Sequence, residues 1–264
     1  MKVYISVDIE GTAGIASWSA TNLGDPEHRA AAQEMTLEAV AACQGALDAG
    51  ATELYVKDAH DSGRNMDLSL FPREAKVIFD WTLTPDSMVA GLDGSFDALM
   101  FVGYHSPAGL PGSPLSHTMN RGNNYVKING ELASEFLLHA YVGAARGVPS
   151  VMVSGDKLLC GHAREFVPGI QTAPVKEGLG RATVNLTPQL ACERIREAAR
   201  EGLLRRDRCH LAVPQTLTME IGFKDHFKAL RASHYPGATL VDPYTVTYTA
   251  ASVDEMMTAR MFIL

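Results

Sequence analysis

The 264-residue sequence predicts an α/β fold, with a mainly parallel β-sheet flanked by helices and a smaller C-terminal α+β lobe. Two observations predict it. In the first part of the chain, short and continuously apolar runs alternate with helical stretches, as in parallel strands buried on both faces. Beyond about residue 180, longer Thr- and Val-rich segments alternate polar and apolar residues. We therefore expect a catalytic α/β lobe over residues 1–180 and an α+β lobe over residues 181–264, packed tightly or merged into one domain.

The expected strands of the first lobe are short and apolar, and most end in glycine or a polar residue. They cover residues 3–7, 52–56, 76–79, 97–103, 125–128 and 149–154. A long helix over residues 27–49 is rich in Ala, Leu, Met and Glu and ends at Gly50. Two further helices are expected, over residues 85–92 and residues 131–146.

The second lobe is expected to begin with an amphipathic helix. The predicted elements are helices over residues 187–204, 224–233 and 253–264, and strands over residues 209–223 and 238–250. No repeat, low-complexity tract or flexible linker separates this lobe from the first.

The composition excludes several classes of protein. A net charge of −7 argues against a nucleic-acid-binding surface. No apolar run approaches the roughly 20 residues that cross a bilayer, and the N-terminus does not have the pattern of a signal peptide. We therefore expect a cytoplasmic protein with reduced cysteines. None of the four cysteines forms a C-x-x-C pair, so no cysteine zinc site is indicated.

Two acidic residues lie at the end of the first expected strand. Asp8 and Glu10 are two positions apart, which places both side chains on one face, roughly 7 Å apart along the backbone. Two carboxylates near a core repel each other and are costly when unpaired. A cation between them removes that cost, so the pair predicts the floor of a metal site. The alternative is a solvated strand end followed by an ordinary glycine turn.

Histidines follow two other strands of the same expected sheet. His60 comes after the second strand, and His105 directly follows the strand over residues 97–103. Ligands of open α/β sheets bind outside the carboxyl ends of the strands, so these residues are expected to converge with Asp8 and Glu10. Histidine and carboxylate together suit zinc. This set exceeds the needs of one catalytic zinc and fits a pair of metals with a bridging carboxylate, as used for hydrolysis.

A phosphatase is the alternative that the first motif itself suggests. The stretch Val7–Thr12 is similar to the Asp-x-Asp-Gly-Thr motif of aspartyl-phosphate phosphatases. Here the second acid is Glu10, and no paired acid accompanies Asp156. Mg²⁺ also prefers oxygen ligands to imidazole, so a metal-dependent phosphatase is a minor alternative.

Several motifs along the whole chain resemble the DppA-type zinc-dependent D-aminopeptidase family. They are Ser6–Gly11, Asp58–His60, Ser87–Asp93, Gly103–His105, Ser116–His117, the helix containing Glu135, Val153–Asp156 and Thr172–Lys176. The resemblance implies two Zn²⁺ ions per chain. The resemblance implies that Asp8 bridges the metals and that the other ligands are Glu10, His60, His105 and Glu135. It leaves open which of the two ions each of these four residues binds.

The acidic ligand from the helix over residues 131–146 needs a choice between two residues. Glu131 and Glu135 are one helical turn apart, and sequence physics does not choose between them. The family pattern, aligned on Asn129-Gly130 and Gly147–Pro149, favours Glu135, with Ser134 in place of the family's glycine. Glu131 remains the rival.

The resemblance implies an aminopeptidase that acts on short peptides or amino-acid amides with an N-terminal D-residue such as D-Ala. Metal-activated water would attack the carbonyl, with His117 as the catalytic nucleophile or base. It also implies a homodecamer of two stacked five-membered rings. The D-preference rests wholly on the resemblance, so an aminopeptidase for L-peptides is the alternative. A non-catalytic metal-binding or ring-forming protein is a minor alternative.

Three residues next to the predicted site receive supporting roles. Asp58 and Asp156 are expected to orient the ligand histidines. The Tyr104 hydroxyl either bonds the reaction intermediate or packs in the core.

Overall fold

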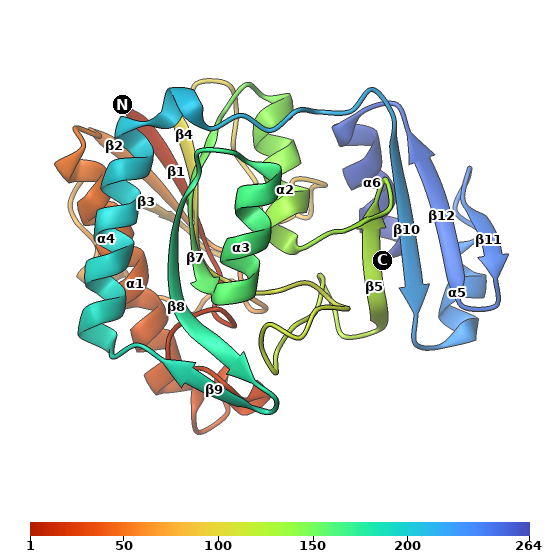
Figure 1. Cartoon of the computed structure of the whole chain (residues 1–264), viewed down its shortest axis with the longest axis horizontal. Coiled ribbons are helices and arrows are strands. Elements are labelled where there is room, and N and C mark those ends of the chain that lie inside the picture. Colours follow the sequence, from red (N-terminus) through yellow and green to blue (C-terminus); the bar gives the residue numbers. More distant parts are fainter.

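A seven-stranded sheet organises most of the chain in the computed structural model, which describes residues 1–264 (Figure 1). Its strand order is β3-β2-β1-β4-β7-β8-β9. The strands are β1 Lys2–Val7, β2 Glu53–Asp58, β3 Ala75–Ile78, β4 Ala98–Tyr104, β7 Ser150–Asp156, β8 Gln171–Leu179 and β9 Ala182–Asn185. Every neighbouring pair is parallel except β8 and β9. The predicted mainly parallel sheet is confirmed.

Helices cover both faces of this sheet. They are α1 His28–Asp48, α2 Glu135–Ala145, α3 Lys157–Phe166 and α4 Pro188–Leu204. Figure 1 shows α1 and α4 side by side on one face, and α2 and α3 on the other. Short 3₁₀ turns lie in the connections, at η1 Trp18–Ala20, η2 Leu68–Leu70, η3 Ser87–Val89 and η4 Arg206–Arg208. The central strands β1 and β4 are therefore buried almost throughout.

A second sheet of five strands is antiparallel, in the order β11-β12-β10-β5-β6. Its elements are β5 Asn123–Ile128, β6 Glu131–Leu132, β10 Leu217–Phe223, β11 Thr239–Asp242 and β12 Thr245–Ala250, with helices α5 His226–Ala232 and α6 Val253–Ile263. The chain is not divided between the two sheets at residue 180. Strands β5 and β6 lie in the second sheet, and α4 packs on α1 beside the first sheet.

The structure corrects the start of the helix predicted over residues 131–146. Asn129 and Gly130 both have positive φ, as a tight hairpin turn requires, and they join β5 to β6. Glu131 therefore lies in a strand. The helix begins at Glu135 because the Ser134 hydroxyl caps it, accepting a hydrogen bond of 3.1 Å from the Leu137 amide.

Other elements also differ from expectation. The predicted helix over residues 85–92 is only the 3₁₀ turn Ser87–Val89. Helix α3 and strands β8 and β9 were not predicted. The Asp156 carboxylate caps α3 by accepting from the Leu159 amide at 2.9 Å, so the chain turns into a helix directly after β7. The predicted strand over residues 238–250 forms the two strands β11 and β12.

The carboxyl ends of β1 and β4 are in close backbone contact. The Gly11 amide donates to the Gly103 carbonyl at 2.7 Å. A Cβ at Gly11 would lie 1.8 Å from the Tyr104 carbonyl oxygen, so only glycine fits there. This contact holds the loop after β1 against β4 and sets the direction in which Asp8 and Glu10 project.

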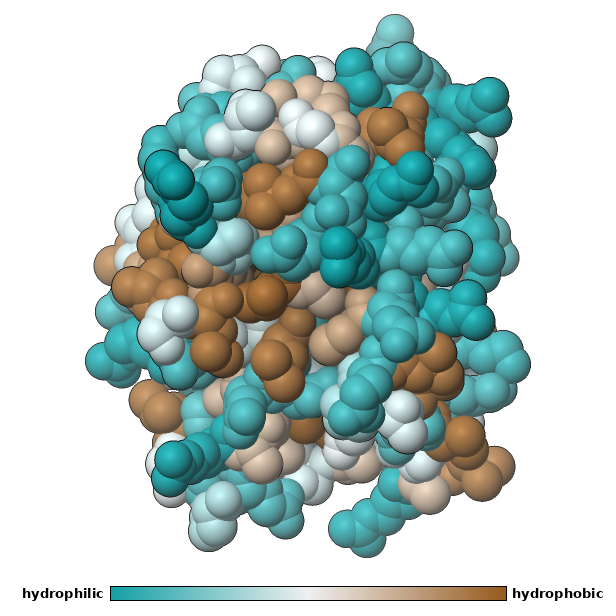
Figure 2. Space-filling view, turned by 90° about the vertical axis from the view of Figure 1, so that its left-hand side faces the viewer, coloured by the Kyte–Doolittle hydropathy of each residue, from teal (hydrophilic) through white to brown (hydrophobic).

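The surface is mixed in character. Figure 2 shows the side that carries α1 and α4, where apolar residues are scattered among hydrophilic ones. None of the helices combines the length and the apolar character needed to cross a membrane.

Candidate metal centre

All six predicted site residues meet at the carboxyl edge of the seven-stranded sheet. Asp8 and Glu10 follow β1, His60 follows β2, and His105 follows β4. His117 lies in the loop before β5, and Glu135 is the first residue of α2. All of them except His105 line a cavity of about 530 Å³.

Asp8 lies between two groups of potential metal ligands. On one side, His60 Nδ1 is 3.2 Å from Asp8 Oδ1 and 3.0 Å from Glu10 Oε2. On the other side, His105 Nε2 is 3.4 Å from Asp8 Oδ2 and 3.5 Å from Glu135 Oε1. One oxygen of Asp8 thus faces each group. In each group the ligand atoms lie within 4.8 Å of one another, close enough for one metal ion.

Several of these atoms are buried without any hydrogen-bond partner. They are Asp8 Oδ2, Glu10 Oε2 and His105 Nε2, on residues that are at most 2 % exposed. An unpaired buried polar atom costs about 1–3 kcal/mol, and more when it is charged. Bound cations would satisfy all three atoms, and the mixed nitrogen and oxygen set suits zinc. The residues therefore fit the metal that the sequence predicts.

The electrostatics of the cluster also favour added positive charge. Burial raises the pKa of Asp8 well above its ordinary value, and the charge of Glu10 raises it further. Burial alone would lower the pKa values of His60 and His105, but the carboxylates outweigh burial and raise both, for His105 to about 10. In the protein alone, these raised pKa values favour protons on Asp8, His60 and His105. Metal ions would replace those protons.

Backbone carbonyls orient all three histidine rings. His60 Nε2 lies 2.7 Å from the Thr21 carbonyl oxygen, and His105 Nδ1 lies 2.9 Å from that of Ser106. His117 Nδ1 lies 2.9 Å from the carbonyl oxygen of Leu115. Each ring donates N–H to its carbonyl, so the other nitrogen of a neutral ring is an acceptor that faces the cluster.

Asp58, predicted to orient a ligand histidine, does not contact the His60 ring itself. Its carboxylate accepts from the amides of Asn65 and Met66 at 2.6 and 2.9 Å, and from the Asn65 side chain at 2.8 Å. The Asn65 side chain in turn donates to the His60 carbonyl at 2.9 Å. Asp58 thus holds the loop that carries His60.

Asp156 likewise holds the chain next to a predicted ligand, and Tyr104 lies in the core. Asp156 accepts from the Ser106 amide and hydroxyl, both at 2.6 Å, and does not contact the His105 ring. The Tyr104 hydroxyl lies 2.8 Å from Ser6 Oγ, and its ring packs on Phe101 in the core. Tyr104 therefore has the packing role.

Of the two candidate acids near α2, the structure brings Glu135 to the cluster. Glu135 is 4 % exposed, and its Oε1 is 3.5 Å from His117 Nε2 and accepts from the Met119 amide at 2.7 Å. Burial would raise its pKa, but His105 and His117 lower it to about 2. Glu131 is exposed in β6 and belongs to none of the ligand groups.

Three residues around the cluster were not singled out from the sequence. The buried Lys176 ammonium donates to the carbonyls of Glu10 and, at 2.6 Å, Ile15. The Trp18 ring packs edge-on against His117 with ring centroids 5.3 Å apart, and the Arg121 guanidinium lies 4.2 Å from the Trp18 centroid. For Lys176, the available signals were its place at the end of a short apolar run and in the family motif Thr172–Lys176. The other two depend on how loops fold together.

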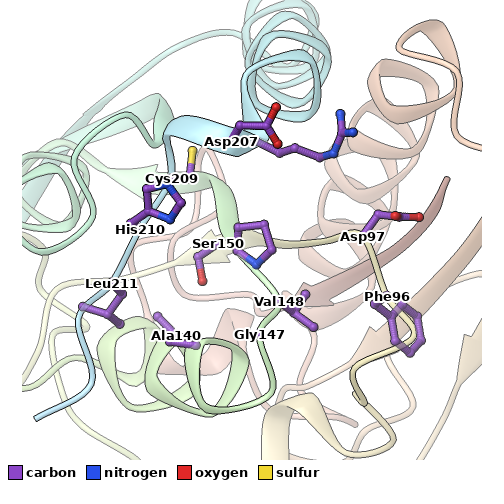
Figure 3. Close-up of a pocket in the computed structure, with 13 residues that line it drawn as sticks. Phe96, Asp97, Ala140, Gly147, Val148, Ser150, Asp207, Cys209, His210 and Leu211 are labelled. Carbon is purple, nitrogen blue, oxygen red and sulfur yellow. The ribbon is translucent and has the colours of Figure 1, made fainter.

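A second cavity, of about 410 Å³, lies at the amino ends of β4 and β7. Figure 3 shows its lining, which includes Asp97, Ser150, Cys209 and His210. The predicted metal ligands lie at the other edge of the sheet.

Comparisons with known proteins identify the family of the chain. The sequence model of a family described as D-aminopeptidase matches residues 1–262. A D-aminopeptidase from Bacillus subtilis (strain 168) is 32% identical over 264 residues, which cover 99% of this chain and 96% of that protein. The solved structure of the Zn-dependent D-aminopeptidase DppA from Bacillus subtilis, a self-compartmentalizing protease, matches with a TM-score of 0.94 and 32% identity over 100% of this chain and 96% of that one. The predicted fold class and family are confirmed: the chain belongs to the D-aminopeptidase family and is an aminopeptidase, a hydrolase of peptide bonds.

Proposed function

We propose that this protein is a dinuclear zinc aminopeptidase that removes an N-terminal D-residue, such as D-Ala, from short peptides or amino-acid amides. One observation carries the proposal. Two groups of buried ligand atoms share Asp8, and each group contains at least one atom without a hydrogen-bond partner. The match to a Zn-dependent D-aminopeptidase supports the choice of zinc.

The distances support a specific division of the ligands. Asp8 would be shared by both ions. Glu10 and His60 would hold one ion with it, and His105 and Glu135 would hold the other. When bound, the zinc ions supply Lewis acidity that polarises the peptide carbonyl and lowers the pKa of water towards about 7.

His117 has the position of a general base and acid. Its Nε2 faces the cluster, 3.5 Å from Glu135 Oε1 and 3.9 Å from Glu10 Oε1. Its ring stacks on His105 with centroids 4.3 Å apart. Burial and the charge of His105 lower the pKa of His117, so the ring is neutral near pH 7 and Nε2 is able to accept a proton. It would take a proton from the attacking water and pass it to the leaving amine.

The D-preference and the assembly are supported by the comparisons alone. The family and its Bacillus relative are both described as D-aminopeptidase. The solved relative is a self-compartmentalizing protease, which supports assembly into an oligomer. We propose that this oligomer is a cytoplasmic homodecamer of two five-membered rings. Large apolar side chains exposed on the second-sheet side, Phe227, Val241 and Phe262, are available for contacts between copies. Mass measurement of the native assembly tests the decamer.

The central experiment measures metal content together with stereochemical preference. We expect about two zinc ions per chain by elemental analysis. We expect hydrolysis of D-Ala-D-Ala and D-alaninamide to exceed hydrolysis of the L-forms, to stop after chelation and to return with added zinc. Full activity of metal-free protein would refute the metal role. One zinc per chain would refute the dinuclear site, and preference for the L-forms would establish the alternative substrate class.

A second experiment tests His117. His117→Ala is expected to retain both zinc ions while kcat falls about 10²- to 10⁴-fold, the usual contribution of a general acid–base group. His162→Ala, on α3, is the matched control and is expected to change neither quantity. Loss of zinc from His117→Ala would show that this residue is a ligand.

A further inference from the structure

Arg121 lies close to the proposed metal centre, on the loop that carries His117. Its guanidinium stacks on Trp18, and Trp18 packs against His117. All three residues line the same cavity as Asp8, Glu10 and Glu135. The Trp18 ring thus contacts both Arg121 and His117, the residue proposed to move the proton.

The charge of Arg121 is not neutralised within the chain. It is the only lysine or arginine among the residues that line this cavity. No carboxylate lies within ion-pair distance of the Arg121 guanidinium. The Arg121 side chain forms no hydrogen bond in the structure. Its contact is with the face of Trp18, which leaves the N–H donors along the edge of the guanidinium free. Such a planar fork matches a carboxylate group.

The backbone that carries Arg121 is held by its neighbours. The Asn120 side chain accepts from the Gly122 amide at 2.7 Å and donates to the Leu264 carbonyl at 2.9 Å. The Asn123 side chain donates to the Thr118 carbonyl at 2.9 Å. On the same loop, the Met119 amide donates a hydrogen bond to the Glu135 carboxylate of the cluster. The position of Arg121 relative to the metal centre is therefore set before a substrate binds.

We propose that Arg121 binds the free C-terminal carboxylate of a dipeptide whose scissile amide lies at the metal centre. The inference rests on the proposed aminopeptidase function and specifies its substrate class. In a dipeptide, one residue follows the scissile bond, and an extended residue spans about 3.3–3.6 Å. The carboxylate that follows this residue would lie in the same cavity, where Arg121 is the only lysine or arginine. Arg121 is a specificity residue in this scheme and moves no proton.

The test compares a dipeptide acid with its C-terminal amide, because the two differ in the group that Arg121 would bind. The probes are D-Ala-D-Ala and D-Ala-D-Ala-amide, or their L-forms if the wild type prefers those. For Arg121→Gln we expect kcat/KM on the acid to fall about 10- to 100-fold, mainly through KM, as for loss of one charged hydrogen-bonded partner. We expect activity on the amide and the zinc content to stay within about twofold of wild type.

Two further variants complete the experiment. Arg121→Lys is expected to recover part of the activity on the acid, because lysine keeps the charge but not the planar fork. Arg73→Gln is the control, since Arg73 is 93 % exposed and precedes β3 at the opposite edge of the sheet. Equal losses on acid and amide, or no loss on the acid, would overturn the role of Arg121. Failure of the wild type to hydrolyse either probe would instead overturn the aminopeptidase function on which it rests.

Discussion

The two edges of the seven-stranded sheet each carry a cavity of similar size, but only one has the character of an active site. The cavity at the carboxyl edge has a volume of about 530 Å³, and that at the amino edge about 410 Å³. Both are lined by acidic residues and histidine. Neither volume nor residue type distinguishes them.

Burial distinguishes the two cavities. At the amino edge, Asp97, Asp207 and His210 are exposed, so water solvates them, and Asp97 also accepts from the Lys2 amide at 2.7 Å. At the carboxyl edge, Asp8, Glu10 and His105 are buried, and each has an atom without a partner. Such an arrangement is stable only when something else satisfies those atoms. Unsatisfied buried ligand atoms therefore indicate a candidate metal site better than the cavity that contains them.

The largest expected effect comes from removing a ligand from the buried cluster. Asp8→Ala and His105→Ala are each expected to lose bound zinc and to lower kcat/KM by several orders of magnitude, because the remaining groups do not complete either site. His210→Ala removes the same residue type from the other edge and is expected to leave zinc content and activity unchanged. Equal effects of His105→Ala and His210→Ala would remove the distinction between the two edges.

A smaller effect is expected from replacing Lys176, whose ammonium holds the loop that contains Glu10 and Ile15 at the carboxyl edge of the sheet. Lys176→Met removes the donor to the Glu10 and Ile15 carbonyls while keeping a similar length of side chain. We expect zinc affinity to fall about 10- to 100-fold, and the free energy of unfolding to fall by about 1–3 kcal/mol. Competition with a chromophoric chelator measures the affinity.

The control for this variant is Lys157→Met. Lys157, on α3, forms an exposed ion pair with Glu177, which follows Lys176 on β8. Such exposed pairs contribute little to stability. Unchanged zinc affinity in Lys176→Met would show that Lys176 does not position Glu10.

The smallest effect on the metal centre concerns Glu38, a buried acid on α1 that contacts the same loop. Its Oε1 accepts from the Ala13 amide at 2.9 Å, and burial raises its pKa to about 8. Between the ordinary carboxyl pKa of about 4.3 and pH 8, the native state holds a proton on Glu38 that the unfolded chain has lost. The free energy of unfolding therefore falls as pH rises through this window.

Glu38→Gln removes that titration. Relative to the wild type, its free energy of unfolding is expected to rise between pH 5 and pH 8, by up to a few kcal/mol. Denaturant unfolding at a series of pH values measures the difference. Glu193→Gln, at an exposed position on α4, is expected to follow the wild type. A constant difference between Glu38→Gln and wild type across this range would contradict the burial effect.

The residues of the candidate site differed in how well the sequence predicted them. Asp8, Glu10, His60 and His105 directly follow apolar strands, so their convergence was predictable from local pattern and the parallel topology. The choice of Glu135 required the family register, because the pattern alone also allowed Glu131. His117 follows no strand, and only the resemblance singled it out. Their roles in metal binding and catalysis stay predictions, which the variants above test.

The sequence by itself determined the parallel sheet and which side chains stand at the ends of its strands. Both follow from local physics: continuous apolar runs become buried strands, and polar residues mark where burial stops. Only the tertiary structure decided that β5 and β6 join the second sheet, that Asp8 directs one oxygen to each ligand group, and that Lys176 reaches the Glu10 carbonyl. These features depend on contacts between segments far apart in the chain. Their geometry is set by how the loops pack together, which no local pattern encodes.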